Sequence, residues 1–333
     1  MRVRHDIGRV AVALLVIGVA GCGLRDHDAA SHAPVQRAAD TTSAATAPWT
    51  PPDTATIPHT PDGDLVRYGR ALVARTAQYL GPRGSVARRT NGMNCDNCHI
   101  DGGTRPYGNT FALVASTYPK FRARSGSMES IEDRINDCFE RSLNGAPLDS
   151  ASREMRAMVA YMQWIGAGAP RAIPDAYAHS ESLAYLDRAA DTTRGRAVYL
   201  ATCQRCHGAD GAGAMDSARV AYVYPPLWGA HSYNVGAGMY QVSRLAGFVK
   251  NNMPFGVTHR APQLTDEQAW DVAAFVDSRP RPSADLRRDW PKIASKPVDY
   301  PFGPYADRFT EAQHKYGPFA PIAAARRPES RIR

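Results

Sequence analysis

Cysteine is scarce in this sequence, and charge of one sign does not dominate it. Six cysteines occur in 333 residues, and they stand in separate contexts that leave no obvious disulfide pair. The formal net charge is only +8, so we expect no nucleic-acid partner, because nucleic-acid binding usually requires a strongly basic surface. Hydrophobic residues make up 44% of the chain, while 25 prolines and 27 glycines predict a globular protein rich in loops.

The N-terminal apolar run is too short to span a bilayer comfortably. It extends from Val10 to Ala20, whereas a transmembrane helix needs roughly 20 residues. Three arginines precede it, which is the layout of a signal peptide over residues 1–21. Gly21-Cys22 then resembles a lipoprotein signal in which Cys22 is lipidated. We expect a periplasmic protein that a lipid anchor on Cys22 holds at a membrane. A plain secretion signal followed by a chance cysteine is the alternative.

The first chemical motif is C-x-x-C-H, formed by Cys95, Cys98 and His99. In an exported protein this pattern is typical of covalent haem attachment, with the histidine as the proximal iron ligand. Half of a zinc site and a redox dithiol are the alternatives. A zinc site would need a second pair of ligands nearby, and the sequence offers none.

The same plan is repeated downstream. Residues 193–200 resemble residues 67–73, and a second C-x-x-C-H motif follows at Cys203, Cys206 and His207. Two motifs that each follow a similar predicted helix support one another. We therefore expect two covalently bound haem c groups, with His99 and His207 as iron ligands.

Met253 is the predicted sixth ligand of the second haem. It precedes a proline on a predicted loop between the haem motif and a closing helix, which begins at the capping box Thr265–Gln268. A c-type cytochrome presents its distal sulfur on such a loop. The other candidates are Met239, Met215, Lys250 and His259.

These patterns predict a mainly α-helical fold with two tandem cytochrome c domains and an extended C-terminal wrap. We expect a signal peptide at 1–21 and a disordered tether at 22–60. The first cytochrome c domain, with the catalytic haem, is expected at 61–170, and a linker at 171–190 leads to the second cytochrome c domain, with the electron-exit haem, at 191–280. An extended tail is expected at 281–333. The tether is rich in Ala, Thr, Pro, Ser and Asp without periodicity, a composition that cannot bury a core. In the tail, His314 is predicted to lie on the surface.

A predicted helix from Ser130 to Gly145 carries Cys138 near its centre. Ser130 and Asp133 fit a capping box, and Asn144-Gly145 fits a helix end. An apolar stripe at helical spacing is predicted to be buried: Ile131, Ile135, Phe139 and Leu143. The methionines of the next helix, between Ser152 and Ile165, are predicted to be core residues rather than ligands.

Cys138 is the candidate reactive group of the first domain. Arg134 and Arg141 stand one turn on either side of it, and such cations favour the nucleophilic, metal-binding thiolate. The first domain lacks an obvious loop methionine, so Cys138 is the candidate second iron ligand. Thiolate ligation would lower the reduction potential below that of a His/Met haem, and electrons would run towards the second haem. A simply buried cysteine is the alternative.

Basic residues around Cys138 indicate an anionic substrate. Arg124 and Arg134, with Lys120, Arg122 and Arg141 nearby, are expected to form one cluster. Two small dianions brought together would repel each other, and bidentate guanidinium groups offset that repulsion. A solvated basic face is the alternative interpretation.

Several stretches resemble the dihaem thiosulfate dehydrogenases. They are Arg124, Arg134–Gly145, Tyr224–Gly229, Ser232–Met239, Asn252-Met253-Pro254 and Lys296–Asp307. The resemblance extends from about residue 62 to 322. It implies His99/Cys138 ligation of the first haem, a cysteine that carries the substrate sulfur, and essential arginines at Arg124 and Arg134. Some relatives have a haem-ligating lysine at the position of Asn252, so the asparagine here implies plain His207/Met253 ligation.

The implied activity is oxidative coupling of two thiosulfates to tetrathionate, with electrons passed to a soluble or membrane-linked acceptor cytochrome. The same site could run in reverse, because the haem potentials decide the direction. Two other classes remain. One is a pure dihaem electron-transfer cytochrome, which would need neither Cys138 nor the arginines. The other resembles the haem subunits of sulfur-oxidising thiosulfotransferases, which act on a carrier protein.

Overall fold

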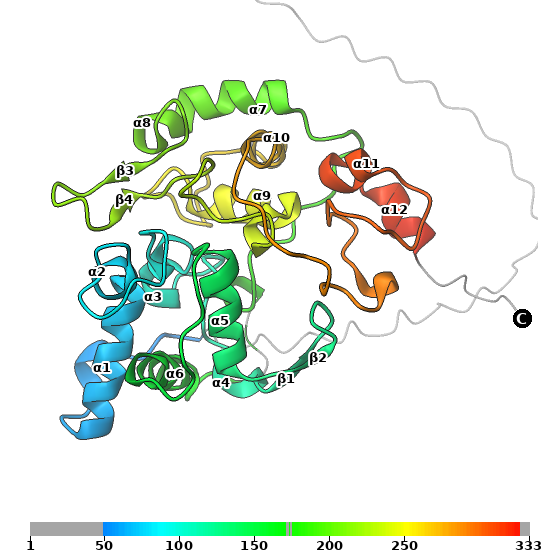
Figure 1. Cartoon of the computed structure of the whole chain (residues 1–333). Helices are drawn as coiled ribbons and strands as arrows, with labels where there is room; N and C mark the ends of the chain where they lie inside the picture. The colour runs from blue at the N-terminus through cyan, green and yellow to red at the C-terminus, as the bar shows by residue number, and fades with distance from the viewer. Residues whose placement is uncertain (1–48, 171–172, 174, 327–333) are drawn as a thin grey trace, which may run out of the picture. The chain divides into compact units, whose positions relative to one another are not determined.

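The computed structural model describes residues 49–170, 173 and 175–326, which form a mainly helical structure with two short hairpins (Figure 1). The helices are α1 (Pro61–Ala74), α2 (Thr76–Leu80), α3 (Ile100–Gly103), α4 (Val114–Thr117), α5 (Ile131–Arg141), α6 (Arg153–Gly166), α7 (Thr192–Val198), α8 (Gln204–His207), α9 (Val242–Asn252), α10 (Asp266–Asp277), α11 (Glu311–Tyr316) and α12 (Ala320–Ala325). Short 3-10 turns are η1 (Thr54–Thr56), η2 (Cys95–Asn97), η3 (Asp175–Tyr177), η5 (Gly238–Tyr240) and η6 (Ile293–Ser295), and η4 (Tyr199–Cys203) is a π-helical turn.

Both hairpins are antiparallel. In the first, β1 (Lys120–Arg122) pairs with β2 (Ser127–Glu129), so that Phe121 faces Met128. In the second, β3 (Ala214–Met215) pairs with β4 (Tyr222–Tyr224). The first hairpin matters for the site, because it carries Lys120 and Arg122 and leads through its turn to Arg124.

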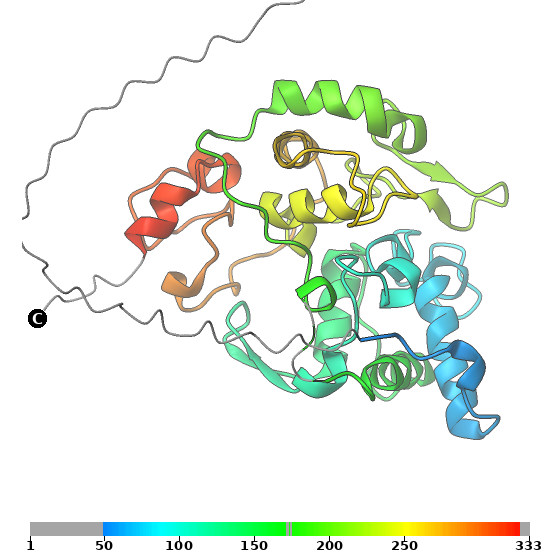
Figure 2. The same ribbon diagram turned by 180° about the vertical axis from the view of Figure 1, so that it is seen from behind.

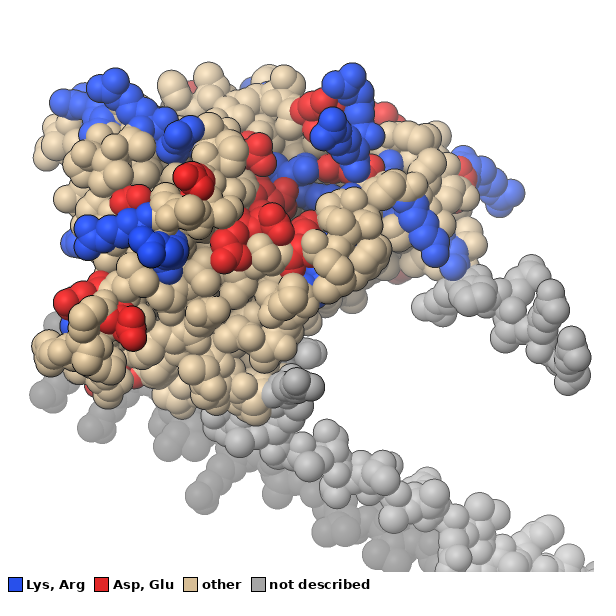
Figure 3. Space-filling model, turned by 60° about the horizontal axis from the view of Figure 1, so that its bottom comes forward, with Lys and Arg blue, Asp and Glu red and all other residues tan. Residues whose placement is uncertain are grey.

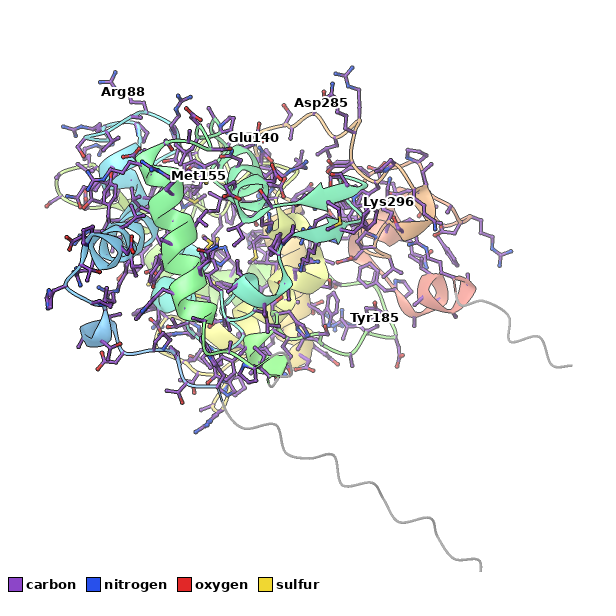
Figure 4. The ribbon with its side chains drawn as sticks, turned by 90° about the horizontal axis from the view of Figure 1, so that it is seen from below. Arg88, Glu140, Met155, Tyr185, Asp285 and Lys296 are labelled. Atoms are coloured by element: carbon purple, nitrogen blue, oxygen red, sulfur yellow. The ribbon has the colours of Figure 1, made fainter. Side chains whose placement is uncertain are left out.

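The first hydrophobic core lies where α1 crosses α6. The crossing is close because Gly69 has no side chain; a Cβ there would stand 1.9 Å from the carbonyl oxygen of Ala157. α5 packs beside α6, and Figure 4 shows Glu140 and Met155 on these neighbouring helices. The predicted apolar stripe of α5 is confirmed as buried, as are the methionines of α6.

The second core repeats this arrangement with α7, α9 and α10. Gly195 of α7 plays the part of Gly69, since a Cβ at Gly195 would stand 1.8 Å from the carbonyl oxygen of Asp271 in α10. The capping box predicted at the start of α10 is confirmed, with Thr265 and Gln268 bonded to each other's backbone. The sequence repeat therefore corresponds to a repeated helix crossing.

The chain after α10 runs beside the first hairpin before it reaches α11 and α12 (Figures 1 and 2). The backbone N–H of Trp290 donates to the carbonyl of Arg124 at 2.6 Å. Farther on, Phe319 and Ile322 are buried in the second core. The predicted extended wrap is thus partly helical, and apolar burial explains why those helices form despite their short sequence pattern.

Two predictions about the ends of the chain need correction. Residues 22–60 were expected to form a disordered tether, but Trp49 and Ile57 are buried in the first core, and the ring of Trp49 lies 5.2 Å from that of Tyr177. Within the described residues 49–60, these two side chains and the bonds from Arg67 to the carbonyls of Ile57 and Pro58 hold the backbone against the core. His314 is fully buried rather than on the surface; it stacks on Tyr305, and Asp307 and the carbonyl of Val298 satisfy its ring nitrogens.

Residues 1–48, which include the predicted signal peptide and Cys22, lie outside the described residues. Within the part that is described, no helix has both the length and the apolar character required to cross a membrane.

Candidate active site

α5 places Cys138 on the wall of a cavity in the first domain. The helix begins at a confirmed capping box, in which Ser130 and Asp133 bond to each other's backbone, and it ends at Arg141, a little earlier than predicted. Its buried stripe fixes its rotation, so that Arg134 and Cys138 face the cavity. Cys138 is half-buried there.

The opposite side of this cavity carries the first C-x-x-C-H motif. Cys95, Cys98 and His99 line it together with Arg134 and Cys138, and its volume is about 250 Å³. Apolar side chains complete the wall: Met93, Phe111, Leu113, Val114, Ile131, Ile135, Phe139, Leu143, Met158 and Met162. A mostly apolar cavity with thiols and an imidazole at its surface has the chemistry that holds a haem.

The orientation of His99 supports this fit. Its Nδ1 lies 2.5 Å from the carbonyl oxygen of Asn109, and only an N–H can donate to a carbonyl. Nε2 is therefore left without a proton and able to bind a metal. Burial also lowers the pKa of His99 to about 4, with help from Arg134, so the ring is neutral near pH 7.

The second motif repeats this device. His207 Nδ1 lies 2.9 Å from the carbonyl oxygen of Pro225, and burial lowers the pKa of the imidazole. Cys203 ends η4 and Cys206 lies in α8. Met253 directly follows α9 and precedes a cis proline. Its place as the partner ligand of His207 stays a prediction.

Arg124 and Arg134 line a second cavity next to the first. Arg134 lines both cavities, and its Nη1 donates to Asp137 at 2.8 Å. Arg124 donates through Nη1 to the carbonyl of Gly236 at 2.8 Å and lies 3.9 Å from Asp289. The structure therefore brings the two predicted arginines together, next to the cavity that holds Cys138.

Arg141 does not flank the thiol as predicted. Its guanidinium group binds Asp137 and makes a bidentate pair with Asp289, with both distances at 2.8 Å. The partner is 148 residues away in the chain, in the segment that follows α10. Because two carboxylates hold Arg141, it joins α5 to that segment instead of serving the thiol. Figure 3 shows acidic and basic side chains close together on one face of the molecule.

The electrostatic effect on Cys138 also differs from the prediction. Arg134, Arg122 and Arg124 favour the thiolate, but burial is the larger effect and raises the pKa of the free thiol. The charge of Cys138 in turn raises the pKa of Arg134 more than any other charge around it. The pair is therefore close, and the arginine partly offsets the cost of burying a thiolate.

Sequence reasoning missed Arg244 of α9, a helix that packs in the second hydrophobic core. Arg244 lines the cavity with Cys138, the cavity with Arg124, and a third cavity beside Asp299. A single arginine on an amphipathic helix is usually a solvated residue, so no local pattern could have indicated this position. Sequence reasoning also missed Asn109. Its carbonyl orients His99, and its Nδ2 donates to the carbonyl of Cys98 at 3.0 Å.

Comparison with known protein families matches both halves of the chain. Residues 85–170 match the SoxA/TsdA cytochrome c domain, and residues 192–280 match the cytochrome c family. This confirms the predicted fold class of two tandem, mainly helical cytochrome c domains. Two such domains imply two covalently bound c-type haems.

Individual relatives agree with these matches. The chain is 40% identical over 237 residues to the thiosulfate dehydrogenase of Allochromatium vinosum, covering 70% of this chain and 84% of that protein. It is 35% identical to the enzyme of the same name from Stutzerimonas stutzeri, covering 70% and 72% respectively.

A solved structure is similar as well. The thiosulfate dehydrogenase (TsdBA) of Marichromatium purpuratum, in its as-isolated form, superposes with a TM-score of 0.64 at 32% identity. The match covers 72% of this chain and half the length of that one. The helix crossings, the two C-x-x-C-H motifs and the level of identity lead to one conclusion: this chain belongs to the thiosulfate dehydrogenase family.

Proposed function

We propose that this protein is an oxidoreductase that couples two thiosulfates to tetrathionate. One observation carries the proposal: Cys138 and Arg134 lie in the same cavity as Cys95, Cys98 and His99. A reactive thiol, an anion-binding group and a haem-attachment motif thus share one space. A pure electron-transfer cytochrome would have no use for the first two.

In this proposal Cys95 and Cys98 would attach the first haem, and His99 and Cys138 would bind its iron. Cys203 and Cys206 attach the second haem, with His207 and Met253 as ligands. The haems supply the capacity to accept electrons one at a time. Residues 61–170 and 191–280 form the two haem domains, with 171–190 between them and 281–333 as a tail.

The chemistry of Cys138 proceeds in two balanced steps. Its sulfur first bonds to the sulfane sulfur of one thiosulfate, giving Cys–S–S–SO3⁻, and the two haems would accept the two electrons that are released. The sulfane sulfur of a second thiosulfate then attacks the sulfane sulfur of this adduct, and the bond from that atom to the Cys138 sulfur breaks. Tetrathionate forms, and Cys138 departs as the thiolate with no further change in oxidation state. Arg134 stands beside the thiol and stabilises its anionic form in both steps.

Arg124 and Arg134 hold the sulfonate groups. Each thiosulfate carries two negative charges, and the repulsion between two unit charges 4 Å apart costs ~4 kcal/mol at an effective dielectric constant of about 20. Guanidinium groups offset this repulsion and orient the oxygens through paired hydrogen bonds. Both arginines line the cavity that adjoins the thiol, which suits them to this role.

The test is the variant Cys138→Ala, assayed for thiosulfate-dependent reduction of an acceptor cytochrome c. The variant should retain both haems, seen in the visible spectrum, yet lose nearly all turnover. Substantial remaining activity would remove Cys138 from the reaction. Arg88→Ala is a suitable control, because Arg88 is exposed and lines neither cavity.

Export and attachment belong to the same proposal. Haem c is attached in exported proteins, so the protein is periplasmic, and lipidation of Cys22 would anchor it to a membrane. The electrons pass from the second haem to an acceptor cytochrome. A Cys22→Ser variant that fractionates with membranes as wild type does would contradict the lipid anchor.

A further inference from the structure

Six cations line the cavity beside Cys138, and most of them already have a carboxylate partner. The paired ones are Arg122 with Glu129 at 3.7 Å, Arg124 with Asp289 at 3.9 Å, Arg134 with Asp137 at 2.8 Å, and Arg141 with Asp137 and Asp289. Among the described residues, Lys120 and Arg244 have no ion pair. Of the six cations, these two therefore keep a positive charge that no carboxylate in the described part of the chain neutralises.

Lys120 and Arg244 also line the cavity that contains Cys138. They come from different domains, since Lys120 begins β1 and Arg244 lies in the first turns of α9. The Nζ of Lys120 is 5.0 Å from the ring centre of Tyr118, so Lys120 makes a cation–π contact with that ring. Arg244 has no side-chain hydrogen bond within the described part of the chain, so its guanidinium group keeps all its donors free.

Arg244 lies where three cavities adjoin one another. Part of the Arg244 side chain is accessible to solvent, but the protein atoms packed around it reduce its hydration and lower its pKa. Arg134 and Arg122 lower this pKa further. The carboxylate of Asp299 acts in the opposite direction. The Asp299 carboxylate accepts hydrogen bonds from the Gln241 side chain and from the backbone N–H and hydroxyl of Ser243. It does not pair with Arg244.

An unpaired guanidinium group is a better anion receptor than a paired one. An anion that binds Arg134 must share it with Asp137, which weakens the net attraction. Arg244 can offer two parallel N–H donors to one sulfonate without breaking an existing contact. Its position at the junction of both cavities places it within reach of an anion that approaches Cys138 from the side of Arg124.

We infer that Arg244 binds the sulfonate of the second, attacking thiosulfate, and the same sulfonate in the tetrathionate product. This inference rests on the proposed function and extends it by naming a residue of the second domain as part of the substrate site. The first thiosulfate is held at Arg134 and bonded to Cys138. The second domain then contributes to substrate binding as well as to electron exit.

The test is steady-state kinetics of Arg244→Ala, with cytochrome c reduction as the readout and thiosulfate concentration as the variable. Loss of a contact made equally before and during the reaction raises KM and leaves kcat nearly unchanged. We expect KM for thiosulfate to rise about tenfold or more, the change that corresponds to ~1.4 kcal/mol. Arg244→Lys should restore part of the affinity because it restores the charge.

Two controls separate this role from others. Arg88→Ala removes the same charge at an exposed position, which Figure 4 shows at the edge of the molecule, and should leave KM unchanged. The visible spectrum and reduction potential of the first haem should be the same in Arg244→Ala as in wild type. A shifted potential with an unchanged KM would overturn the inference, because Arg244 would then serve the haem rather than the substrate.

The outcomes also separate this inference from the proposed function. An active wild type with an unchanged KM in Arg244→Ala would remove Arg244 from the substrate site and leave the proposed function intact. A wild type that fails to oxidise thiosulfate would overturn the proposed function, and the inference with it. Thermal unfolding of each variant, followed by circular dichroism, checks that any loss is not caused by misfolding.

Discussion

Asn252 donates a hydrogen bond from its side-chain amide to the backbone carbonyl of Tyr107, at a distance of 3.2 Å. The two residues belong to different haem domains. Tyr107 lies two residues before Asn109, which orients His99, and Asn252 directly precedes Met253. This contact therefore links the loop that supports His99 to the helix end that carries Met253, and these are the predicted iron ligands of the two haems.

Replacing Asn252 by alanine should destabilise the protein. The amide also donates to the carbonyl of Phe248 at 3.0 Å, and the residue is fully buried. Alanine would remove the two hydrogen bonds that this buried amide makes, at a cost of about 1–3 kcal/mol. Urea unfolding of Asn252→Ala beside exposed Arg88→Ala measures the difference. Equal midpoints in the two variants would show that the contact contributes nothing.

Two glycines should tolerate no side chain, for the same reason in each domain. Gly69→Ala and Gly195→Ala would each push a methyl group into a backbone carbonyl across a helix crossing, at 1.9 and 1.8 Å. We expect each change to lower the free energy of unfolding by ~2 kcal/mol or more. Gly168→Ala is the matched control, because a Cβ there meets nothing within 4 Å. If all three variants melt alike, the crossings are looser than described.

Arg141 should matter for stability rather than for catalysis. Arg141→Ala would leave Asp289, whose side chain is 6% exposed, with the more distant Arg124 and Tyr300 as partners. Breaking a buried pair by removal of one partner costs about 3 kcal/mol. We expect faster amide hydrogen exchange in the segment after α10. A variant with normal exchange but lost activity would place Arg141 in the reaction instead.

The stability of the protein should depend on pH through Asp277. This carboxyl is 2% exposed, and burial raises its pKa to about 7 despite Arg281, Tyr233 and Lys315, while Asp299 raises it further. Its pKa in the unfolded chain is about 3.9. Between these values the native protein holds a proton that the unfolded chain has released, so this contribution to stability falls as pH rises from about 4 to 7.

Asp277→Asn removes this titration. The free energy of unfolding of wild type and variant is measured with urea across the same pH range. As pH rises, the variant should become more stable relative to wild type. Other titrating groups affect both proteins equally and cancel in the difference. A difference that stays constant from pH 4 to 7 would mean that Asp277 is ionised throughout.

Features set by neighbouring residues could be predicted from the sequence. The capping box of Ser130 and Asp133 and the buried stripe of α5 depend only on residues within one helix. The C-x-x-C-H motifs likewise contain their own chemistry in five residues. The similar helix before each motif could likewise be predicted, because the repeat lies within one short stretch of sequence.

Features set by distant partners could not be predicted. Arg141 reads as a neighbour of Cys138 along the helix, and only the folded chain shows that Asp289 holds it. Arg244 reads as a solvated residue until α9 is placed beside the first domain. Trp49 and His314 lie in segments of low complexity or low periodicity, where burial depends on surfaces formed elsewhere.

Met253→Gly should change the second haem and leave substrate binding largely intact. A thioether ligand raises the potential of a haem, so its loss should lower the potential of the second haem and slow electron transfer to the acceptor. Met239→Leu is the control, because Met239 packs against both cores and its sulfur lies 4.0 Å from the Asn109 amide. Spectroelectrochemical titration of both variants tests the assignment. If the potential of the second haem moves in Met239→Leu and not in Met253→Gly, the ligand assignment is reversed, and the loop after α9 loses its role in electron exit.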